Sequence, residues 1–383
     1  MVAAGCCRWR RIKALSRVTL SPAMATLQIY RMTAPADWIN VLRQSSKPHV
    51  PYHRLAIDWP STYHRAMTPL QALQPLSATA PVLPDPFDTA AHLPYTLLVR
   101  ELHRLLEDDS VQVPPRLVQP LAGGGSLFVM PALDARTAIA KLITFTPANA
   151  ARGLPTIQGD VLVFDLATGR RLMLLDGPTV TARRTAAVSV LAAQRLAANT
   201  QGPLLIVGAG VQGRAHLEAF AEVLKITEVV IASRSSASAD ALALHAQSLG
   251  LRARVVDDAN AALADCPLAV TCTPAQSVVL SALPRRDGFI AAVGAFTPSM
   301  LELAPALCLH VAAHGTVVVD TQDARHEAGD LLQAGLDVRQ FATLAQVIRQ
   351  DIRKSGGPVL FKSCGWAGWD LAAARTALAP RGD

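Results

Sequence analysis

The spacing of apolar residues gives the chain two different patterns, which meet near residue 200. Before that point, leucines at helical spacing predict a helix over 93–106, and an extended segment starts at 112–114. An Ala-rich stretch predicts a second, longer helix over 181–198. Between the helices, a turn at 167–169 separates the last two of four predicted strands, which cover residues 126–130, 137–144, 159–165 and 171–176.

After residue 200, apolar strand-like runs alternate with helical segments. The runs cover residues 204–207, 228–232, 253–256, 268–271, 289–293 and 317–320. This alternation is typical of a parallel, doubly wound sheet. The tail from His326 to Ala379 is predicted to be mostly helical. We therefore predict an α/β protein with three ordered segments, 86–200, 201–322 and 323–383, of which the central one is the doubly wound domain.

The first 85 residues lack sustained periodicity and are rich in proline. This is typical of a disordered tail. Two alternatives stay open: an Arg- and Ser-rich targeting peptide, or an extension that results from a start codon assigned too far upstream, with the true start at Met24 or Met67. We favour the last of these and expect order to begin near Phe87.

The composition limits the class of protein. Of the 383 residues, 51% are hydrophobic and 17% are charged, which fits a soluble α/β protein. No apolar run approaches the roughly 20 residues of a membrane span. The net charge of +7 is concentrated before Pro84, where ten basic residues face two acidic ones, so the remainder is nearly neutral. This distribution argues against nucleic-acid binding.

The six cysteines contain no CxxC pair and no histidine partner at metal-ligand spacing. We therefore expect no metal site. Structural thiols in a reducing cytoplasm are the simplest interpretation, and we predict a cytoplasmic protein.

Three glycines follow the apolar run 204–207 at the spacing of a dinucleotide-binding turn. Gly208 permits the tight turn, Gly210 allows the phosphates to approach the backbone, and Gly213 lets the next helix pack closely. Val211 and Gln212 complete the turn, and the phosphates would lie at the positive end of that helix. The alternative is a glycine-rich turn without a ligand. The preceding strand and following helix favour a Rossmann dinucleotide site.

The end of the next strand indicates which dinucleotide is bound. An NAD-binding fingerprint expects an acidic residue there, but this chain has Ser233 and Arg234. A guanidinium and hydroxyl groups accept a 2′-phosphate, which a carboxylate would repel. We therefore predict NADPH, with NADH possible. The alternative is that Arg234 is an ordinary surface charge.

Several motifs in a fixed order extend the picture beyond one turn. They are Val113-Pro114-Pro115-Arg116, Ala140-Lys141, Leu172–Gly177, Thr181–Ala187, Val207–Gly213, Val293–Pro298, Glu327–Asp330 and Phe361–Ala367. From about residue 88 onward, the chain resembles the ornithine cyclodeaminase/μ-crystallin family, and within it the Δ1-pyrroline-2-carboxylate reductase branch. The resemblance implies that the segments on either side of the Rossmann domain build one α+β substrate and dimerisation domain.

The resemblance places the substrate's carboxylate on Arg116, Lys141 and Arg184. Guanidinium groups bind a planar carboxylate with two hydrogen bonds, and a lysine adds a point charge, so the chemistry agrees. The alternative for each residue taken singly is an ordinary surface charge, and the joint match to the ordered motifs favours the carboxylate site. Arg183 is the alternative to Arg184, since consecutive helical residues point about 100° apart. Lys141 is also the candidate proton donor, and the alternative is an imine that arrives already protonated.

Further cofactor contacts follow from the resemblance. Thr156 and Ser363 match positions near the nicotinamide, and Thr273 matches one near the adenosine ribose or pyrophosphate. The alternatives are a strand threonine and hydroxyls in turns. We expect the Cys364 thiol to be inert. The carboxylates of Asp320, Glu327 and Asp330 are expected to be structural caps.

Phe296 departs from the cyclodeaminase pattern. Cyclodeaminases resemble this stretch but carry an Asp there, which is implied in directing water onto the substrate, and a phenyl ring moves no proton. The alternative is that Glu302 replaces that acid.

We therefore predict NADPH-dependent reduction of the C=N bond of a cyclic imino acid, which gives proline from Δ1-pyrroline-2-carboxylate or pipecolate from Δ1-piperideine-2-carboxylate. Alternatives on the same scaffold are an ornithine cyclodeaminase, an amino acid dehydrogenase and a non-catalytic NADP-dependent ligand-binding protein of the μ-crystallin type. The resemblance also implies a homodimer.

Overall fold

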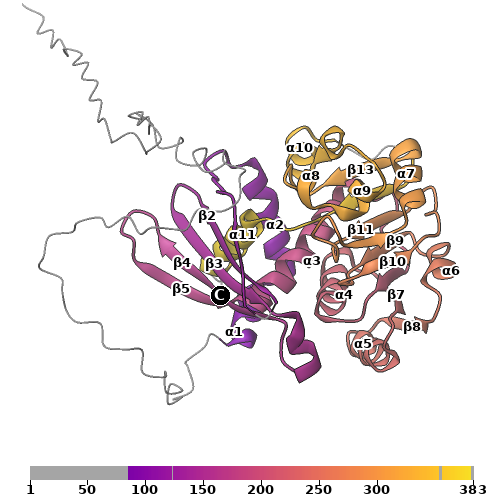
Figure 1. Ribbon diagram of the computed structural model, residues 1–383, viewed down its shortest axis with the longest axis horizontal. Coiled ribbons are helices and arrows are strands. Elements are labelled where there is room, and N and C mark those ends of the chain that lie inside the picture. The colour runs from indigo at the N-terminus through magenta and orange to yellow at the C-terminus, as the bar shows by residue number, and fades with distance from the viewer. Residues whose placement is uncertain (1–84, 123, 353–355, 381–383) are drawn as a thin grey trace, which may run out of the picture. The chain divides into compact units, whose positions relative to one another are not determined.

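The computed structural model describes residues 85–122, 124–352 and 356–380. All of them belong to one compact unit, 78–383. The prediction of a disordered or wrongly assigned extension concerns residues that lie, except for Asp85, outside this described part. The α/β class is confirmed, because the described residues form one antiparallel sheet of five strands and one sheet of eight parallel strands (Figure 1).

The five-stranded sheet is a simple antiparallel meander in the order β1-β2-β3-β4-β5. Its strands are β1 (Leu117–Pro120), β2 (Ser126–Leu133), β3 (Thr137–Phe145), β4 (Ile157–Asp165) and β5 (Arg171–Asp176), and a 3-10 helix (Pro147–Arg152) joins β3 to β4. Burial alternates along β3, where Ile139, Lys141 and Ile143 are buried and the residues between them are not. One face of the sheet therefore packs inward, and a lysine lies on that face.

Helices cover the inner face of this sheet. They are α1 (Pro86–Ala91), α3 (Gly177–Leu196) and the C-terminal α11 (Ala367–Leu378), and α2 (Tyr95–Glu107) packs against α3 and α11. Asp176 caps the N-terminus of α3, because its carboxylate accepts a hydrogen bond from the Thr179 backbone N–H, and a proline stands in the first turn. In Figure 1, α11 lies beside β2 and β3, which precede it by more than 200 residues in the sequence.

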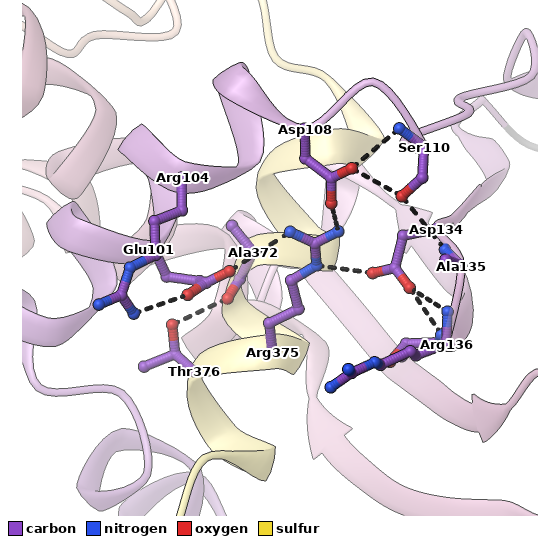
Figure 2. Close-up of polar contacts among 11 residues, drawn as sticks. Glu101, Arg104, Asp108, Ser110, Asp134, Ala135, Arg136, Ala372, Arg375 and Thr376 are labelled. Carbon is purple, nitrogen blue, oxygen red and sulfur yellow. Dashed lines mark hydrogen bonds and ion pairs between the residues drawn. The ribbon is translucent and has the colours of Figure 1, made fainter.

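Arg375 holds α11 in this position (Figure 2). Its Nε donates to Asp134 Oδ2 at 2.6 Å, in the β2–β3 turn, and its Nη2 donates to Asp108 Oδ2 at 2.6 Å, just after α2. The other oxygen of Asp108 accepts from the Ser110 backbone N–H and hydroxyl. One guanidinium therefore ties the C-terminal helix to a helix and a strand turn that lie more than 240 residues earlier.

The parallel sheet has the order β14-β13-β15-β11-β9-β6-β7-β8. Its strands are β6 (Leu204–Val207), β7 (Glu228–Ala232), β8 (Arg252–Val256), β9 (Leu268–Thr271), β11 (Phe289–Ala292), β13 (Thr316–Val319), β14 (Ala342–Thr343) and β15 (Val359–Lys362). Central strands are buried on both faces, as expected for a doubly wound sheet. The connecting helices include α4 (Val211–Leu224), α5 (Ser236–Ser248), α6 (Ala259–Leu263) and α7 (Pro305–His314).

The prediction of a mostly helical C-terminal segment that completes the substrate domain is wrong in part. Strands β14 and β15 enter the parallel sheet, together with the short helices α8 (Ala324–Glu327), α9 (Gly329–Gln333) and α10 (Leu344–Arg349) and the 3-10 turn Val338–Gln340. Only α11 returns to the antiparallel sheet. Strand β15 has four residues and no polar alternation, because both of its faces are buried, so periodicity does not identify it.

Two further strands were not predicted. β10 (Gln276–Leu280) and β12 (Leu301–Leu303) form a separate two-stranded parallel pair. Both are short, and β12 has only three residues. Such short segments carry too little pattern to separate them from loops.

Candidate active site

The turn between β6 and α4 has the geometry that a dinucleotide needs. Gly208 has φ +113°, a conformation that side chains other than glycine rarely adopt. A Cβ at Gly213 would lie 2.1 Å from the Gly208 carbonyl oxygen, so only glycine lets α4 pack this closely. Gly210 is the N-cap of α4 and makes no side-chain cap, and a Cβ added there would meet no atom of the described residues within 4 Å. The helix N-terminus therefore faces open space suited to a phosphate.

The next two residues of this turn have different surroundings. Val211 is 72% exposed. Gln212 lines a cavity, and its Nε2 contacts the Thr181 carbonyl of α3 at 3.5 Å. Its buried Oε1 has no hydrogen-bond partner among the described residues. A buried amide oxygen without a partner suits a site that receives a ligand with a donor group.

The cavity has a volume of about 260 Å³ and is lined by both sheets and by α3. From the parallel sheet come the loops that follow the carboxyl ends of β9, β11 and β15, the edge where α/β sheets bind ligands. From the antiparallel sheet comes the inner face of β2 and β3. The apolar residues of the cavity wall come from both sheets: Phe128, Met130, Ile143, Phe145, Ile157, Val293 and Phe296.

Three cationic residues line this cavity: Arg116, Lys141 and Arg184. Lys141 Nζ donates to Asp370 Oδ1 at 3.0 Å, and Arg184 Nε donates to the same oxygen at 3.2 Å. Lys141 and Asp370 are wholly buried, and the Arg184 side chain is 7% exposed. Burial lowers the pKa of Lys141 to about 8, although Asp370 opposes this shift.

The Arg184 guanidinium is held by its inner nitrogen only. Within the described residues, its two terminal nitrogens make no hydrogen bond, and they lie next to Gly365 at the cavity. The fork that binds a carboxylate with two hydrogen bonds is therefore available. Arg183, the alternative, lies elsewhere: its guanidinium stacks 3.8 Å from the Tyr95 ring centre and donates to the Leu93 carbonyl. The structure thus brings Arg184, and not Arg183, to the cavity.

Arg116 forms an ion pair with Glu327, at the end of α8. The pair links the segment before β1 to the parallel-sheet side of the molecule. Burial raises the pKa of Glu327 to about 7, against the effect of Arg116. The expectation that Glu327 is a cap is therefore wrong, because its carboxylate neutralises a cavity arginine.

Phe296 contributes an apolar group at the position where the resemblance to cyclodeaminases implies an acid. Its ring meets Phe145 edge-on, with centroids 6.2 Å apart, and both rings line the cavity. Glu302, the alternative acid, is wholly buried and accepts hydrogen bonds from the backbone of Thr273, Gly294 and Ala295. It holds two cavity loops in place and does not line the cavity, so it does not replace the missing acid.

The remaining predicted cofactor residues lie in two places. Thr156, Thr273 and Ser363 line the cavity. The Thr273 hydroxyl donates to Glu302, and the Ser363 hydroxyl donates to Asp320. Ser233 and Arg234 lie after β7, where Arg234 is exposed and has no ion-pair partner within the described residues. The backbone turn they form leads into α5, which Ser235 caps.

The other two carboxylates and the cysteine behave as structural groups. Asp320 Oδ2 accepts from the backbone N–H groups of Cys364 and Gly365, which orders the loop after β15. Asp330 accepts from the Glu302 backbone and pairs with Lys362 at 2.7 Å. Burial raises the pKa of the Cys364 thiol, which fits an inert side chain.

Asp370 is the site residue that sequence reasoning did not identify. It follows the Phe361–Ala367 motif by three residues, and it is an acidic residue in the first turn of a mostly buried helix. A charge on the buried face of a helix is a signal for a buried partner, and Lys141 is that partner. The described residues contain no group of three or more His, Cys, Asp or Glu side chains arranged to hold a metal ion. None of the helices described is long and apolar enough to cross a membrane.

Comparison with known proteins agrees with this geometry. The pattern of the ornithine cyclodeaminase/mu-crystallin family matches residues 96–378. This chain belongs to that family. Among its relatives, the Δ1-pyrroline-2-carboxylate reductase 1 of Burkholderia multivorans is 40% identical over 301 residues, which cover 76% of this chain and 94% of the relative.

Two other family members extend the comparison. The Δ1-pyrroline-2-carboxylate/Δ1-piperideine-2-carboxylate reductase of Azospirillum brasilense is 40% identical over 76% of this chain and 94% of its own length. The structure of the Thermococcus litoralis Δ1-pyrroline-2-carboxylate reductase, in complex with NADH and L-proline, superposes with a TM-score of 0.71. It is 25% identical and covers 77% of this chain and 95% of that one.

Proposed function

We propose that this protein is an NAD(P)H-dependent reductase of cyclic α-imino acids, which converts Δ1-pyrroline-2-carboxylate to L-proline and Δ1-piperideine-2-carboxylate to L-pipecolate. The observation that carries this proposal is the arrangement of Arg116, Lys141 and Arg184 around one cavity whose other wall is apolar. The cations suit a single carboxylate, and the apolar wall suits the methylene groups of a small ring.

The cofactor is held by the β6–α4 turn. The backbone N–H groups that follow Gly210 bind the pyrophosphate, and Ser233 and Arg234 take the ribose 2′-phosphate, so we favour NADPH over NADH. Thr156, Thr273 and Ser363 line the cavity. Thr156 and Ser363 supply hydroxyl groups near the nicotinamide, and Thr273 supplies one towards the adenosine ribose or pyrophosphate. The bound nicotinamide supplies a hydride to C2 of the substrate.

Lys141 supplies the proton that completes the reaction. The carboxylate and the ring nitrogen are both attached to C2, so an ammonium that contacts the carboxylate also reaches the nitrogen. The Lys141 ammonium donates a proton to that nitrogen while C2 receives the hydride, and the C=N bond becomes a CH–NH bond. With a pKa of about 8, Lys141 is protonated at neutral pH and recovers its proton from solvent.

Phe296 directs the chemistry towards reduction alone. Cyclodeamination requires water to be activated next to the iminium carbon, and the Phe296 and Phe145 rings offer no base to activate it. The ornithine cyclodeaminase alternative is therefore disfavoured on this scaffold.

The outer face of the antiparallel sheet supports a homodimer. Leu117 and Leu142 are exposed, and the outward positions of β2 and β4 carry further apolar residues: Leu127, Val129, Pro131, Leu133, Leu162 and Phe164. A sheet face of this kind is typical of a subunit interface. Measurement of the solution mass tests this: a dimer that Leu142→Glu converts to a monomer supports it, and a wild-type monomer contradicts it.

A substrate panel tests the proposed function. Oxidation of NADPH and NADH is followed with Δ1-pyrroline-2-carboxylate and Δ1-piperideine-2-carboxylate, and ammonia is assayed separately with ornithine and NAD. We expect cofactor oxidation with the two imino acids, faster with NADPH, and no ammonia from ornithine. Ammonia release without imine reduction would overturn the proposal.

A further inference from the structure

One carboxylate oxygen organises two of the three cavity cations. Asp370 Oδ1 accepts from Lys141 Nζ at 3.0 Å and from Arg184 Nε at 3.2 Å. The three residues come from β3, α3 and α11, which pack against one another. Asp370 itself does not line the cavity, whereas Lys141 and Arg184 do. It therefore stands behind the residues that meet the substrate.

This carboxylate is expensive to keep. Asp370 is wholly buried, and its Oδ2 has no hydrogen-bond partner among the described residues. A buried ionised group whose second oxygen is unpaired costs free energy, and apolar replacements of buried ion pairs are often at least as stable. Stability alone thus gives no reason for a carboxylate at this position, which points to a role in the site.

The surroundings of Lys141 leave Asp370 as the group that favours its charged form. On the strands next to β3, Met130 of β2 and Val161 of β4 pair with Lys141, and both are buried and apolar. Arg184 and Arg116 face it as like charges, and together with burial they lower its pKa. Among the main contributors, Asp370 raises that pKa, through its charge and its hydrogen bond.

We propose that Asp370 is a positioning residue, which keeps the Lys141 ammonium charged and turns the free fork of Arg184 towards the cavity. Its fixed negative charge lets cationic residues converge before the substrate arrives, and the substrate carboxylate then adds the second anion. The inference rests on the proposed function, in which Lys141 is the proton donor.

The test compares wild type with Asp370→Asn, which keeps the shape and removes the charge. We expect the alkaline limb of kcat/KM for Δ1-pyrroline-2-carboxylate, near pH 8 in the wild type, to move down by at least about one pH unit. Rates at pH 8 should then fall about tenfold relative to those near pH 6.5. An alkaline limb at the same pH in both proteins would overturn the proposal.

A binding readout separates this inference from the proposed function. The affinity for pyrrole-2-carboxylate, a planar anion that is not reduced, is measured against pH in both proteins. In both proteins affinity should fall as the pH rises, and we expect this fall to begin at a lower pH in Asp370→Asn than in wild type. If wild type binds this anion and Asp370→Asn shows the same pH dependence of affinity, the role of Asp370 is contradicted. Wild type that neither binds it nor reduces the imine contradicts the proposed function instead.

Two further variants keep the test decisive. Asp330→Asn is the control. It breaks a second wholly buried Lys–Asp pair, between Lys362 and Asp330, and neither residue lines the cavity. It should lower stability and leave the alkaline limb in place, whereas an equal shift would show that the effect is merely structural. If Asp370→Asn does not fold, pyrrole-2-carboxylate binding to Lys141→Arg serves, because the guanidinium stays charged and the loss of affinity above pH 8 should disappear. Affinity that still falls above pH 8 in Lys141→Arg contradicts the proposal.

Discussion

Arg183 and Arg184 are consecutive in α3, yet their guanidinium groups serve different parts of the molecule. Arg184 donates to the buried Asp370 and lines the cavity, whereas Arg183 stacks on Tyr95 and donates to the Leu93 carbonyl. The turn of about 100° between consecutive helical residues accounts for the difference. The two arginines are therefore a matched pair for testing the carboxylate site.

Arg184→Ala is expected to raise KM for the imino acid by roughly 10- to 100-fold, because a charged hydrogen-bonded contact is worth about 1.5–3 kcal/mol. Steady-state kinetics with Δ1-pyrroline-2-carboxylate measure this. Arg183→Ala should leave KM unchanged and lower the melting temperature, since it removes a packing contact outside the cavity. Equal effects of the two variants on KM would contradict the assignment.

Arg234→Ala is expected to raise KM for NADPH about tenfold or more and to leave KM for NADH nearly unchanged. Arg234 would contact only the 2′-phosphate, which NADH lacks, and a charge-assisted contact of this kind is worth at least about 1.4 kcal/mol. The measurement is the ratio of kcat/KM for the two cofactors. A ratio that stays the same would leave Arg234 as an ordinary exposed charge.

Phe296→Asp is expected to lower kcat/KM for the imino acid at least about tenfold, because a carboxylate against Phe145 is poorly solvated and repels the substrate's own carboxylate. Phe296→Leu, the control, keeps the apolar wall and should stay within about threefold of wild type. Activity of the Asp variant equal to that of the Leu variant would show that the wall's polarity does not matter.

His216 should make the fold sensitive to mild acid. The ring is wholly buried, donates from Nδ1 to the Gln212 carbonyl and contacts Ser189 Oγ at 2.9 Å. Burial lowers the pKa of His216 to about 4, whereas its value in the unfolded chain is about 6.5. Between these two pH values only the unfolded chain takes up the proton. Stability should therefore fall as pH drops through this window, by up to about 3 kcal/mol.

Denaturant unfolding between pH 7 and pH 4 measures this slope. His216→Gln should flatten the slope relative to wild type. Ser189→Ala removes a neighbour but keeps the ring, so it should lower stability with the slope unchanged. A wild-type slope in His216→Gln would contradict the account.

The sequence predicted the α/β class, and its strand predictions for the parallel sheet from 204 to 320 agree with the structure to within about one residue, because buried strands between helices carry a strong pattern. It did not predict that β15 enters the parallel sheet. It also missed Asp370, which lies 229 residues from Lys141 along the chain. The contact depends on how α11 packs against β3, and no local pattern encodes that packing.

The candidate site follows the same division. The glycine turn could be identified locally, since Gly208 and Gly213 are needed by their own short segment. The Arg116–Glu327 pair joins residues 211 positions apart, and sequence reasoning took Glu327 for a cap. Motifs thus identify which residues take part, and tertiary structure determines which charge neutralises which.

The most direct test of the central claim is the fate of the transferred hydrogen. NADPH that carries deuterium at the transferring C4 position is incubated with the protein and Δ1-pyrroline-2-carboxylate, and the product is examined by mass spectrometry. We predict L-proline with one deuterium at C2. Product without deuterium at C2, or no proline at all while the protein binds NADPH, would contradict hydride transfer to the imine carbon.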